Sequence, residues 1–266
     1  MAEHLNLYQQ ARYYDVIFDR DVSKEVDFIF ALYRQHNGRE LTSMLDIACG
    51  PGYHARAFAS RGARAVGLDL RPEMIDFAHE KDVAAGVSIT LLPADMRDFE
   101  LDTAVDVALA AFDGLDALLS NEDLIRHFRA VARNLTPGGL YIVDLTHPRD
   151  CSYEHYGAFH YSGERDGVKV NIDWATNNPH YDLITSIAYV ELQMHIQDHG
   201  QEYLVQDAAR ERLLLPQEIH LLAELSGGLK VVGWHGDFDL NQPLDNSAAS
   251  RRMIAVLQRR ESIILA

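Results

Sequence analysis

Residues 44–52 read MLDIACGPG, and this stretch decides the fold of the chain. An apolar run with one acid, Asp46, breaks into a turn of small residues from Ala48 to Gly52, and the residues that follow, YHARAFASRG, are typical of a helix. A strand, a tight glycine turn and a helix bring backbone amides and a helix N-terminus close to a ligand, because no large side chain blocks the approach. The stretch therefore predicts a pocket for a nucleotide-like ligand.

Apolar strands and helices alternate from this turn onward. From residue 213 to the end, the same pattern returns with one helix and two strands. Strands that alternate with helices indicate a mostly parallel sheet with both faces covered. Strands are predicted at 44–48, 64–70, 87–94, 105–111 and 139–145, and helices at 53–61, from Pro72 onward and at 120–134.

The alternation stops between residues 146 and 212. Turn clusters such as SGERDG and TNNPHYD separate runs such as VKVNIDWAT, in which apolar and polar residues alternate with a period of two. This period is typical of antiparallel strands. We therefore predict one α/β domain, formed by residues 41–145 and 213–266, with an antiparallel insertion at 146–212 after its fifth strand.

The composition limits the classes of partner. The chain has 24 Lys and Arg against 40 Asp and Glu, and the resulting net charge of −16 repels phosphate backbones and anionic lipids. No apolar run is long enough to span a bilayer, the N-terminus MAEHLNLYQQ lacks a signal sequence, and Cys49 and Cys151 form no disulfide framework. We expect a cytoplasmic protein that binds neither nucleic acid nor membrane.

Acidic side chains lie at or near the ends of three successive strands. Asp69 follows Gly50 by 19 residues, at a place where a carboxylate can accept both hydroxyls of a ribose. Asp95 ends the third strand, where it can accept the amino group of an adenine, and Asp46 lies in the first. Taken singly, Asp69 or Asp95 is equally well explained as a turn or helix cap. Together, the acids predict a ligand with ribose hydroxyls, an amino-purine and a cationic end.

A nicotinamide dinucleotide is the competing ligand. Its G-x-G-x-x-G turn serves a pyrophosphate, and here Ala48 takes the place of the first glycine, whereas Ala55 at the third position is permitted. Asp46 would also be poorly placed beside a pyrophosphate. An NAD-dependent oxidoreductase is therefore a minor alternative.

The motifs resemble those of class I S-adenosylmethionine-dependent methyltransferases of the small-molecule branch. The stretch MLDIACGPGYHARAFASRG is similar to the first motif of that family, VGLDL to the second, ADMRDF to the third, AAFDGLDALL to the fourth and LTPGGLYIVDL to the fifth. The segment RLLLPQEIHLLAELSGGLKVVGW resembles its closing helix and strand. The resemblance implies an α/β, Rossmann-like, doubly wound, mostly parallel seven-stranded sheet, and an N-terminal helical lid at residues 1–40.

The resemblance also implies how S-adenosylmethionine is held. The turn backbone would line the methionine moiety, Asp69 would hold the ribose, and Asp95 with Met96 would hold the adenine. The segment Tyr13-Tyr14-Asp15 resembles the part that folds over the cofactor. The implied cofactor contacts are Tyr13, Asp46, Ala48, Gly50, Gly52, Asp69, Leu70, Asp95, Met96, Ala111 and Phe112.

Methyl transfer is an in-line displacement that requires an aligned and unprotonated nucleophile. His147, in DLTHP, is the first candidate base because it follows the fifth strand and should face the cleft, although it could instead fix the loop. Asp113, in AFDGLD, could orient a substrate or neutralise its ammonium, or cap the next helix. Tyr14 could shape the methyl channel or only pack.

The insertion offers candidate substrate contacts. Arg212 could bind a carboxylate in a bidentate manner or be a surface arginine, and Tyr156 and Trp174 could line a pocket or pack inside the insertion. Histidines are dense here, but His195 and His199 have helical spacing in a segment that reads as strand, so we predict no metal site.

These observations predict a methyltransferase that uses S-adenosylmethionine to methylate an amine, or a hydroxyl, of a small-molecule metabolite. Resemblance to amino-sugar and natural-product N-methyltransferases favours nitrogen. One alternative is a methyltransferase for tRNA or another macromolecule, which the net charge disfavours, and another is a cofactor-binding module without catalysis. The insertion could also form the contact of a homodimer.

Overall fold

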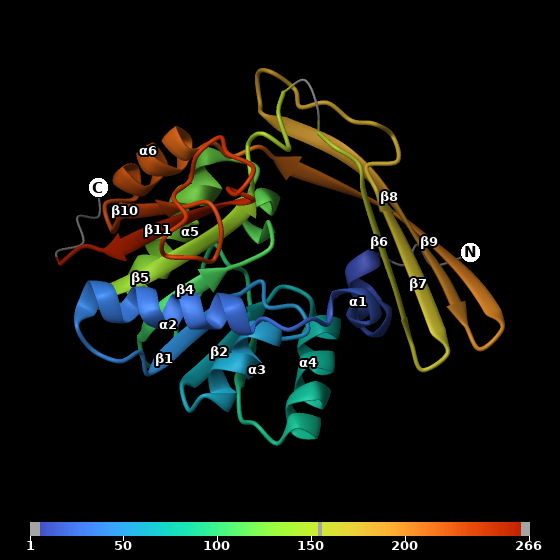
Figure 1. Cartoon of the computed structure of the whole chain (residues 1–266), viewed down its shortest axis with the longest axis horizontal. Helices are drawn as coiled ribbons and strands as arrows, with labels where there is room; N and C mark the ends of the chain where they lie inside the picture. Colours follow the sequence, from blue (N-terminus) through green and yellow to red (C-terminus); the bar gives the residue numbers. More distant parts are fainter. Residues whose placement is uncertain (1–5, 154–155, 262–266) are drawn as a thin grey trace.

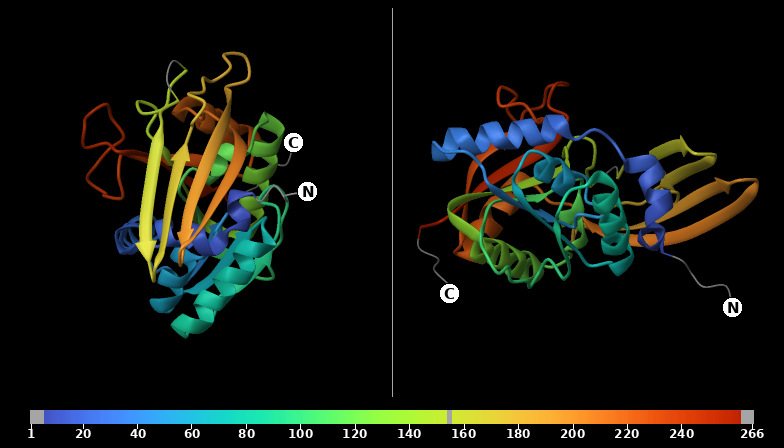
Figure 2. Two further views of the ribbon diagram at one scale, coloured as in Figure 1. Left: turned by 90° about the vertical axis from the view of Figure 1, so that its right-hand side faces the viewer. Right: turned by 90° about the horizontal axis from the view of Figure 1, so that it is seen from below.

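The structure, a computed structural model, describes residues 6–153 and 156–261. An α/β body and a second, antiparallel sheet lie side by side, and the short helix α1 (Ala11–Phe18) lies between them (Figure 1 and the right view of Figure 2). Residues 1–5 of the predicted lid and residues 262–266 of the predicted α/β domain lie outside the described residues.

The main sheet, as far as the chain is described, has seven strands. β1 pairs in parallel with β2 and β4, whereas β11 runs antiparallel to both β5 and β10. The predicted mostly parallel, seven-stranded sheet is therefore confirmed. In sheet order the strands are β10 (Leu229–His235), β11 (Arg252–Arg259), β5 (Leu135–Thr146), β4 (Val105–Ala110), β1 (Ser43–Ile47), β2 (Arg64–Asp69) and β3 (Thr90–Pro93).

Helices cover both faces of this sheet. Phe28 of α2 and Phe58 of α3 pack with one face of the sheet, and Phe128 of α5 and Leu222 of α6 pack with the other. Burial of such side chains is the main source of stability for the body. The body helices are α2 (Ser23–Asn37), α3 (Tyr53–Ser60), α4 (Pro72–Ala85), α5 (Asn121–Asn134) and α6 (Pro216–Ser226).

The insertion after β5 is an antiparallel sheet, as predicted. Along β8 every second side chain is buried, including those of Val190, Met194 and Ile196, so one face of this sheet is apolar. That face packs against Leu7 and the aromatic side chains of α1. The strands, in order, are β6 (Phe159–Arg165), β7 (Val168–Trp174), β8 (Ile187–Asp198) and β9 (Gln201–Arg212).

The N-terminal segment departs from a continuous helix. A single turn of 3-10 helix, η1 (Leu7–Gln9), precedes α1, and an extended residue, Asp19, ends α1 before α2 begins at Ser23. The side chain of Asp19 pairs with Lys81 and Arg165, so the interruption bends the chain toward both the body and the insertion. Of the described helices, none combines the length and apolar content that crossing a bilayer requires.

Candidate active site

The glycine turn between β1 and α3 is held in an unusual backbone conformation. Ala48, Gly50 and Gly52 have φ angles of 54°, 50° and 79°. This left-handed region is uncommon for alanine and costs about 1–2 kcal/mol, so the turn is held there by its surroundings. The Cys49 amide donates to Leu68 O at 2.9 Å and the Gly50 amide donates to Asp69 Oδ2 at 2.8 Å.

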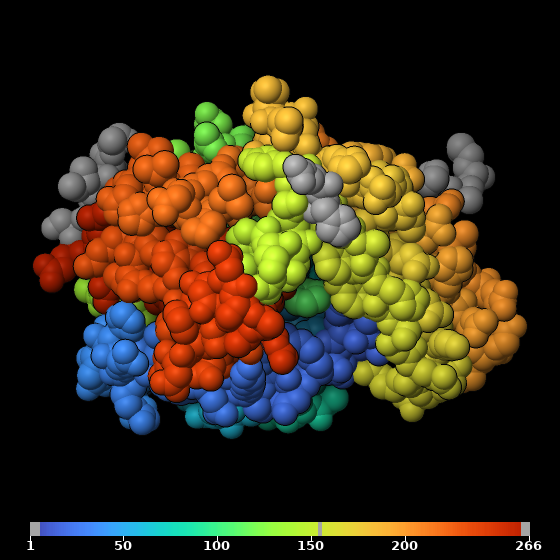
Figure 3. Space-filling model, turned by 45° about the horizontal axis from the view of Figure 1, so that its top comes forward, coloured from blue at the N-terminus to red at the C-terminus, as the bar shows by residue number. Residues whose placement is uncertain are grey.

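A cavity of about 420 Å³ opens at the carboxyl ends of the central strands. This is where a parallel sheet binds its ligands. Figure 3 shows a hollow between the blue N-terminal helices, the orange-red segment before β11 and the yellow insertion. Most of the predicted cofactor contacts line the cavity, namely Asp46, Ala48, Gly50, Asp69, Leu70, Asp95, Met96, Ala111 and Phe112.

Two of the predicted acids, Asp46 and Asp69, have raised pKa values because they are buried. Asp46 is 2% exposed and accepts one hydrogen bond, from the Ala55 amide at 3.1 Å, and burial raises its pKa to about 7. Asp69 accepts hydrogen bonds from two backbone amides. Burial raises its pKa, although these two donors act to lower it. Both carboxylates would be stabilised by a cationic ligand or by hydroxyl donors.

Asp95 is arranged differently, because its carboxylate already binds Arg97. The Arg97 backbone amide and guanidinium both donate to it, and the guanidinium lowers its pKa. Next to it, Met96 O is 2.8 Å from Nδ1 of the buried His127. The third strand end is thus fixed by local contacts and still lines the cavity.

A second cavity, of about 400 Å³, adjoins the first. Tyr8, Tyr14, Phe18 and Phe112 line both cavities. The ring centroids of Tyr14 and Phe18 are 4.3 Å apart, and those of Phe18 and Phe112 are 5.6 Å apart. The two cavities therefore meet at an aromatic wall built from the N-terminal segment and the β4–η2 loop, where η2 is Gly114–Ala117.

The second cavity is acidic. Asp113, Asp116 and Glu211 line it together with Arg252, and Arg252 pairs with Asp144 at 2.7 Å and with Asp113 at 3.1 Å. Because Asp144 and Asp113 already pair with that guanidinium, the carboxylate of Glu211 is the group that favours a cationic ligand. The Asp113 side chain also accepts the Thr146 amide, and it makes no capping hydrogen bond to η2, the helix that follows.

Aromatic side chains complete the second cavity. Tyr156 and Trp174, both predicted as substrate contacts, line it from the insertion side, and the Trp174 indole donates to the Tyr156 hydroxyl at 3.1 Å. Tyr156 in turn donates to Glu211. Their contact with a substrate stays a prediction.

The prediction that His147 faces the cleft is wrong. Its ring is 3% exposed, Nε2 is 2.9 Å from Asp245 O, and Nδ1 accepts the Arg149 amide at 3.1 Å. The described residues that line the two cavities do not include it. The chain turns sharply after Thr146, and this turn directs the imidazole toward the loop before β11.

Three other predicted contacts, Arg212, Tyr13 and Gly52, are not among the described residues that line either cavity. Arg212 is 6% exposed and donates to Glu218 and Asn121, so it joins the end of β9 to the body helices. The Tyr13 hydroxyl donates to Asp198 at 2.9 Å, on the insertion side of α1. Gly52 has a φ of 79°, which favours glycine, and a Cβ there would lie 3.2 Å from Arg56 Nη1.

Two histidines in the described part of the insertion pair with neighbouring aspartates. His160 pairs with Asp173 and His199 pairs with Asp198, both at the surface. Over the described ranges, no group of three or more His, Cys, Asp and Glu side chains is placed to hold a metal ion.

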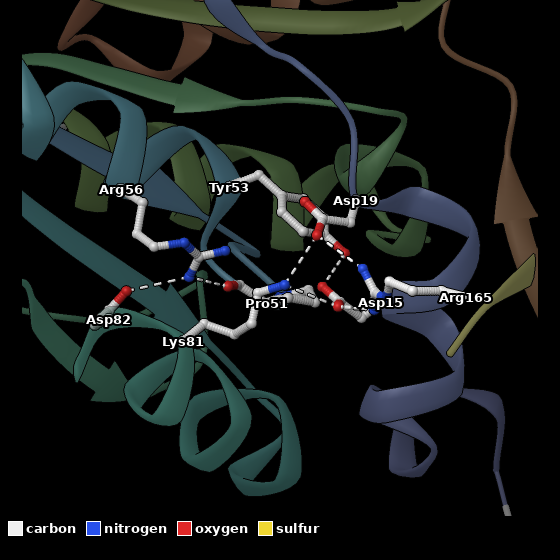
Figure 4. Close-up of polar contacts among 8 residues, drawn as sticks. All are labelled: Asp15, Asp19, Pro51, Tyr53, Arg56, Lys81, Asp82 and Arg165. Atoms are coloured by element: carbon white, nitrogen blue, oxygen red, sulfur yellow. Dashed lines mark hydrogen bonds and ion pairs between the residues drawn. The ribbon is translucent and has the colours of Figure 1, made fainter. Parts of the chain in front are cut away.

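A network of ion pairs holds α1 in place between the body and the insertion (Figure 4). The Asp15 carboxylate is completely buried, and it accepts from Lys81 of α4, from Arg165 of β6 and from the Tyr53 hydroxyl. Asp19 accepts from the same lysine and arginine at 2.9 Å each. The N-terminal helix is thereby tied to the body and to the insertion at once.

Comparison with known proteins relates the chain to methyltransferases. Residues 44–139 match the family described as methyltransferase domain. The chain is 35% identical over 103 residues to the putative methyltransferase YqeM of Bacillus subtilis (strain 168), covering 38% of this chain and 41% of that protein. It is 31% identical over 134 residues to the dTDP-3-amino-3,4,6-trideoxy-alpha-D-glucopyranose N,N-dimethyltransferase of Streptomyces venezuelae, covering 49% and 54%. The chain thus spans about half the length of these relatives.

The fold is similar to that of a solved sugar N-methyltransferase. The sugar N-methyltransferase KedS8 from Streptoalloteichus sp ATCC 53650 superposes with a TM-score of 0.75 at 22% identity, over 98% of this chain and 96% of that one. At this identity the likeness shows the fold, and its coverage includes the antiparallel insertion.

Proposed function

We propose that this chain, which carries a class I S-adenosylmethionine-dependent methyltransferase domain, transfers a methyl group from S-adenosylmethionine to an amine of a small-molecule metabolite. The donor supplies a methyl carbon on a positively charged sulfur. The residues of the first cavity fit it: Asp69 suits ribose hydroxyls, Asp95 with Met96 suits an adenine, and the buried Asp46 suits a cationic end.

The contact between the two cavities is the observation that carries this proposal. An in-line displacement needs the donor and the acceptor on opposite sides of the methyl carbon, with water excluded. Tyr8, Tyr14, Phe18 and Phe112 border both cavities and supply an apolar boundary for that step. Burial raises the pKa of Tyr14 well above its usual range, so its role there is to pack and position as a neutral phenol.

The charge of the second cavity favours an amine over a hydroxyl. Protonated amines are attracted by the carboxylates of Glu211 and Asp113, and by the faces of the aromatic rings around them. The relative from Streptomyces venezuelae and KedS8 are both named as N-methyltransferases of sugars, which supports nitrogen as the acceptor atom.

The parts of the fold receive roles from this proposal. Residues 7–22 cover the donor, whereas α2 packs on the body. The described parts of 41–145 and 213–266 bind the donor, and the described part of the insertion at 146–212 forms one wall of the acceptor cavity. A homodimer, a cytoplasmic location and a role in natural-product synthesis stay predictions.

The test is a turnover assay with matched acceptors. The protein is incubated with S-adenosylmethionine and with amino sugars, amino acids and short peptides, each beside its hydroxyl counterpart, and methylated products are identified by mass spectrometry. We expect S-adenosylhomocysteine to form with amines. Turnover of hydroxyl acceptors alone would contradict the amine assignment, and NAD binding without S-adenosylmethionine binding would contradict the proposal as a whole. Total tRNA is included as a further acceptor, and a methylated RNA product would favour the macromolecular alternative.

A further inference from the structure

Glu211 occupies a position on the insertion that faces the acceptor cavity. It pairs with Ala188 in the antiparallel register of β8 and β9. Because side chains alternate along a strand, Glu211 shares a face with Asp207. The Asp207 carboxylate accepts the Leu7 amide at 2.9 Å, so this face of β9 is turned toward the N-terminal segment and the body.

We propose that Glu211 takes the proton from the ammonium group of the acceptor, and that Tyr156 and Trp174 hold its carboxylate in position. The inference rests on the proposed amine methylation and names the proton acceptor that this reaction needs. It assigns that role to the insertion and not to the loop after β5, where His147 lies.

A chain of hydrogen bonds fixes the carboxylate. The Trp174 indole of β7 donates to the Tyr156 hydroxyl at 3.1 Å, and that hydroxyl donates to Glu211 Oε2. Tyr156 is 4% exposed and packs with Tyr181 and Phe159, so it has little freedom to move. A base held in this way keeps its orientation while different acceptors enter the cavity.

The surroundings suit a base that works near neutral pH. Burial raises the pKa of Glu211 to about 7, and the charge of Asp113 adds to this effect, whereas the donors Tyr156 and Trp174 oppose it. A base is most effective when its pKa lies near the working pH. The other charged or titratable groups that line this cavity are Tyr8, Tyr14, Asp116, Asp150, Cys151, Tyr161, Tyr181, Arg251 and Arg252.

The neighbouring groups are less suited to the task. Asp113 is engaged by Arg252 and by the Thr146 amide. Burial and the adjacent Asp113 carboxylate raise the pKa of Asp116 well above its usual range, which favours its neutral form. Arg252 is neutralised by Asp144 and cannot accept a proton.

The proton balance of the step is simple. The ammonium nitrogen gives one proton to a Glu211 carboxylate oxygen, which leaves its lone pair free. That lone pair forms the new N–C bond to the methyl carbon while the C–S bond breaks and its electrons remain on sulfur. The methylated amine leaves as a cation, and the Glu211 carboxylic acid returns its proton to water.

Glu211→Gln tests this assignment, because glutamine keeps the shape and the hydrogen bond from Tyr156 but is not basic. We expect kcat for an alkylamine to fall about 100-fold, within the range for loss of a general base. The affinity for S-adenosylmethionine should stay within about twofold, since Glu211 lines only the acceptor cavity of the two. Glu211→Asp should restore part of the rate. The matched control is Glu202→Gln at the exposed start of β9, which should behave as wild type.

The pH profile of the wild-type enzyme gives an independent test that needs no variant. For an alkylamine with a pKa of about 10, kcat should rise to a plateau near pH 7, where Glu211 loses its proton. A kcat that increases steadily with pH up to the pKa of the amine would overturn the inference. A Glu211→Gln variant with the kcat of the wild type would also overturn it. Absence of wild-type turnover on every amine would instead overturn the proposed function, and the inference with it.

Discussion

The Lys81 ammonium of α4 lies 2.9 Å from the buried Asp15 carboxylate of α1, and this pair joins the N-terminal helix to the body. Tyr14 and Phe18, which border both cavities, are carried by the same helix. The position of the aromatic wall therefore depends on contacts that lie outside the cavities themselves.

Lys81→Met is expected to loosen α1 while keeping most of the apolar stem of the side chain. Removing one charged partner of a buried carboxylate costs about 1–2 kcal/mol where another cation, here Arg165, remains. We expect S-adenosylmethionine to bind about 5- to 30-fold more weakly by calorimetry, and amide exchange in residues 11–18 to quicken. The control is Lys24→Met, which removes the exposed partner of the half-buried Asp237, away from both cavities. Equal affinities for S-adenosylmethionine in the two variants would show that the position of α1 does not affect cofactor binding.

Asp69→Asn tests the predicted ribose contact. The substitution removes the charge but keeps one oxygen for the Gly50 or Arg71 amide, both of which donate to Asp69 at 2.8 Å. Loss of two charge-assisted hydrogen bonds, at about 1.5 kcal/mol each, should weaken S-adenosylmethionine binding about 100-fold. Calorimetric titration measures this, with the exposed Asp98→Asn as the control. Wild-type affinity would remove Asp69 from the site.

The sequence was sufficient to place these strand-end residues, because the topology of the sheet follows from the alternation of strands and helices. Once β1 and β2 are recognised as parallel neighbours, the acids at Asp46 and Asp69 must lie at one edge of the sheet. No long-range contact had to be known to place them together.

The orientation of side chains in and after the loops was harder to predict from the sequence, because it depends on contacts with residues far along the chain. His147 turns toward Asp245, which is 98 residues later. Glu211 went unnoticed because an alternating strand does not reveal which of its faces is covered. Tyr13 and Tyr14 are adjacent on α1, and only the docking of the helix shows that Tyr14 lines the cavities.

His147→Ala should affect stability and leave the chemistry intact. The ring bridges Asp245 O and the Arg149 amide in a buried setting, and loss of such a bridge costs about 1–3 kcal/mol. We expect a lower midpoint in urea, with kcat unchanged at a temperature where the variant is folded. The exposed His160→Ala, which removes a surface pair with Asp173, serves as the control. A selective fall in kcat would return His147 to the list of candidate bases.

Asp46→Asn is expected to stabilise the unliganded protein at high pH. Burial holds the pKa of Asp46 at about 7, above its usual value of 3.8, so the folded state disfavours the ionised form. The stability from this group is therefore complete below about pH 4 and declines as the pH rises through 7. Asparagine avoids that loss and can still accept the Ala55 amide.

Urea denaturation of both proteins at pH 4 and pH 8 measures the effect. Asp46→Asn should be more stable than wild type at pH 8 by about 1–3 kcal/mol, an allowance for partial relaxation of the buried charge, and equal to it at pH 4. The variant should also bind S-adenosylmethionine more weakly, because the carboxylate suits the cationic end of that ligand. A gain of the same size at both pH values would show that Asp46 is not the titrating group, and a loss at pH 8 would show that its charge stabilises the turn.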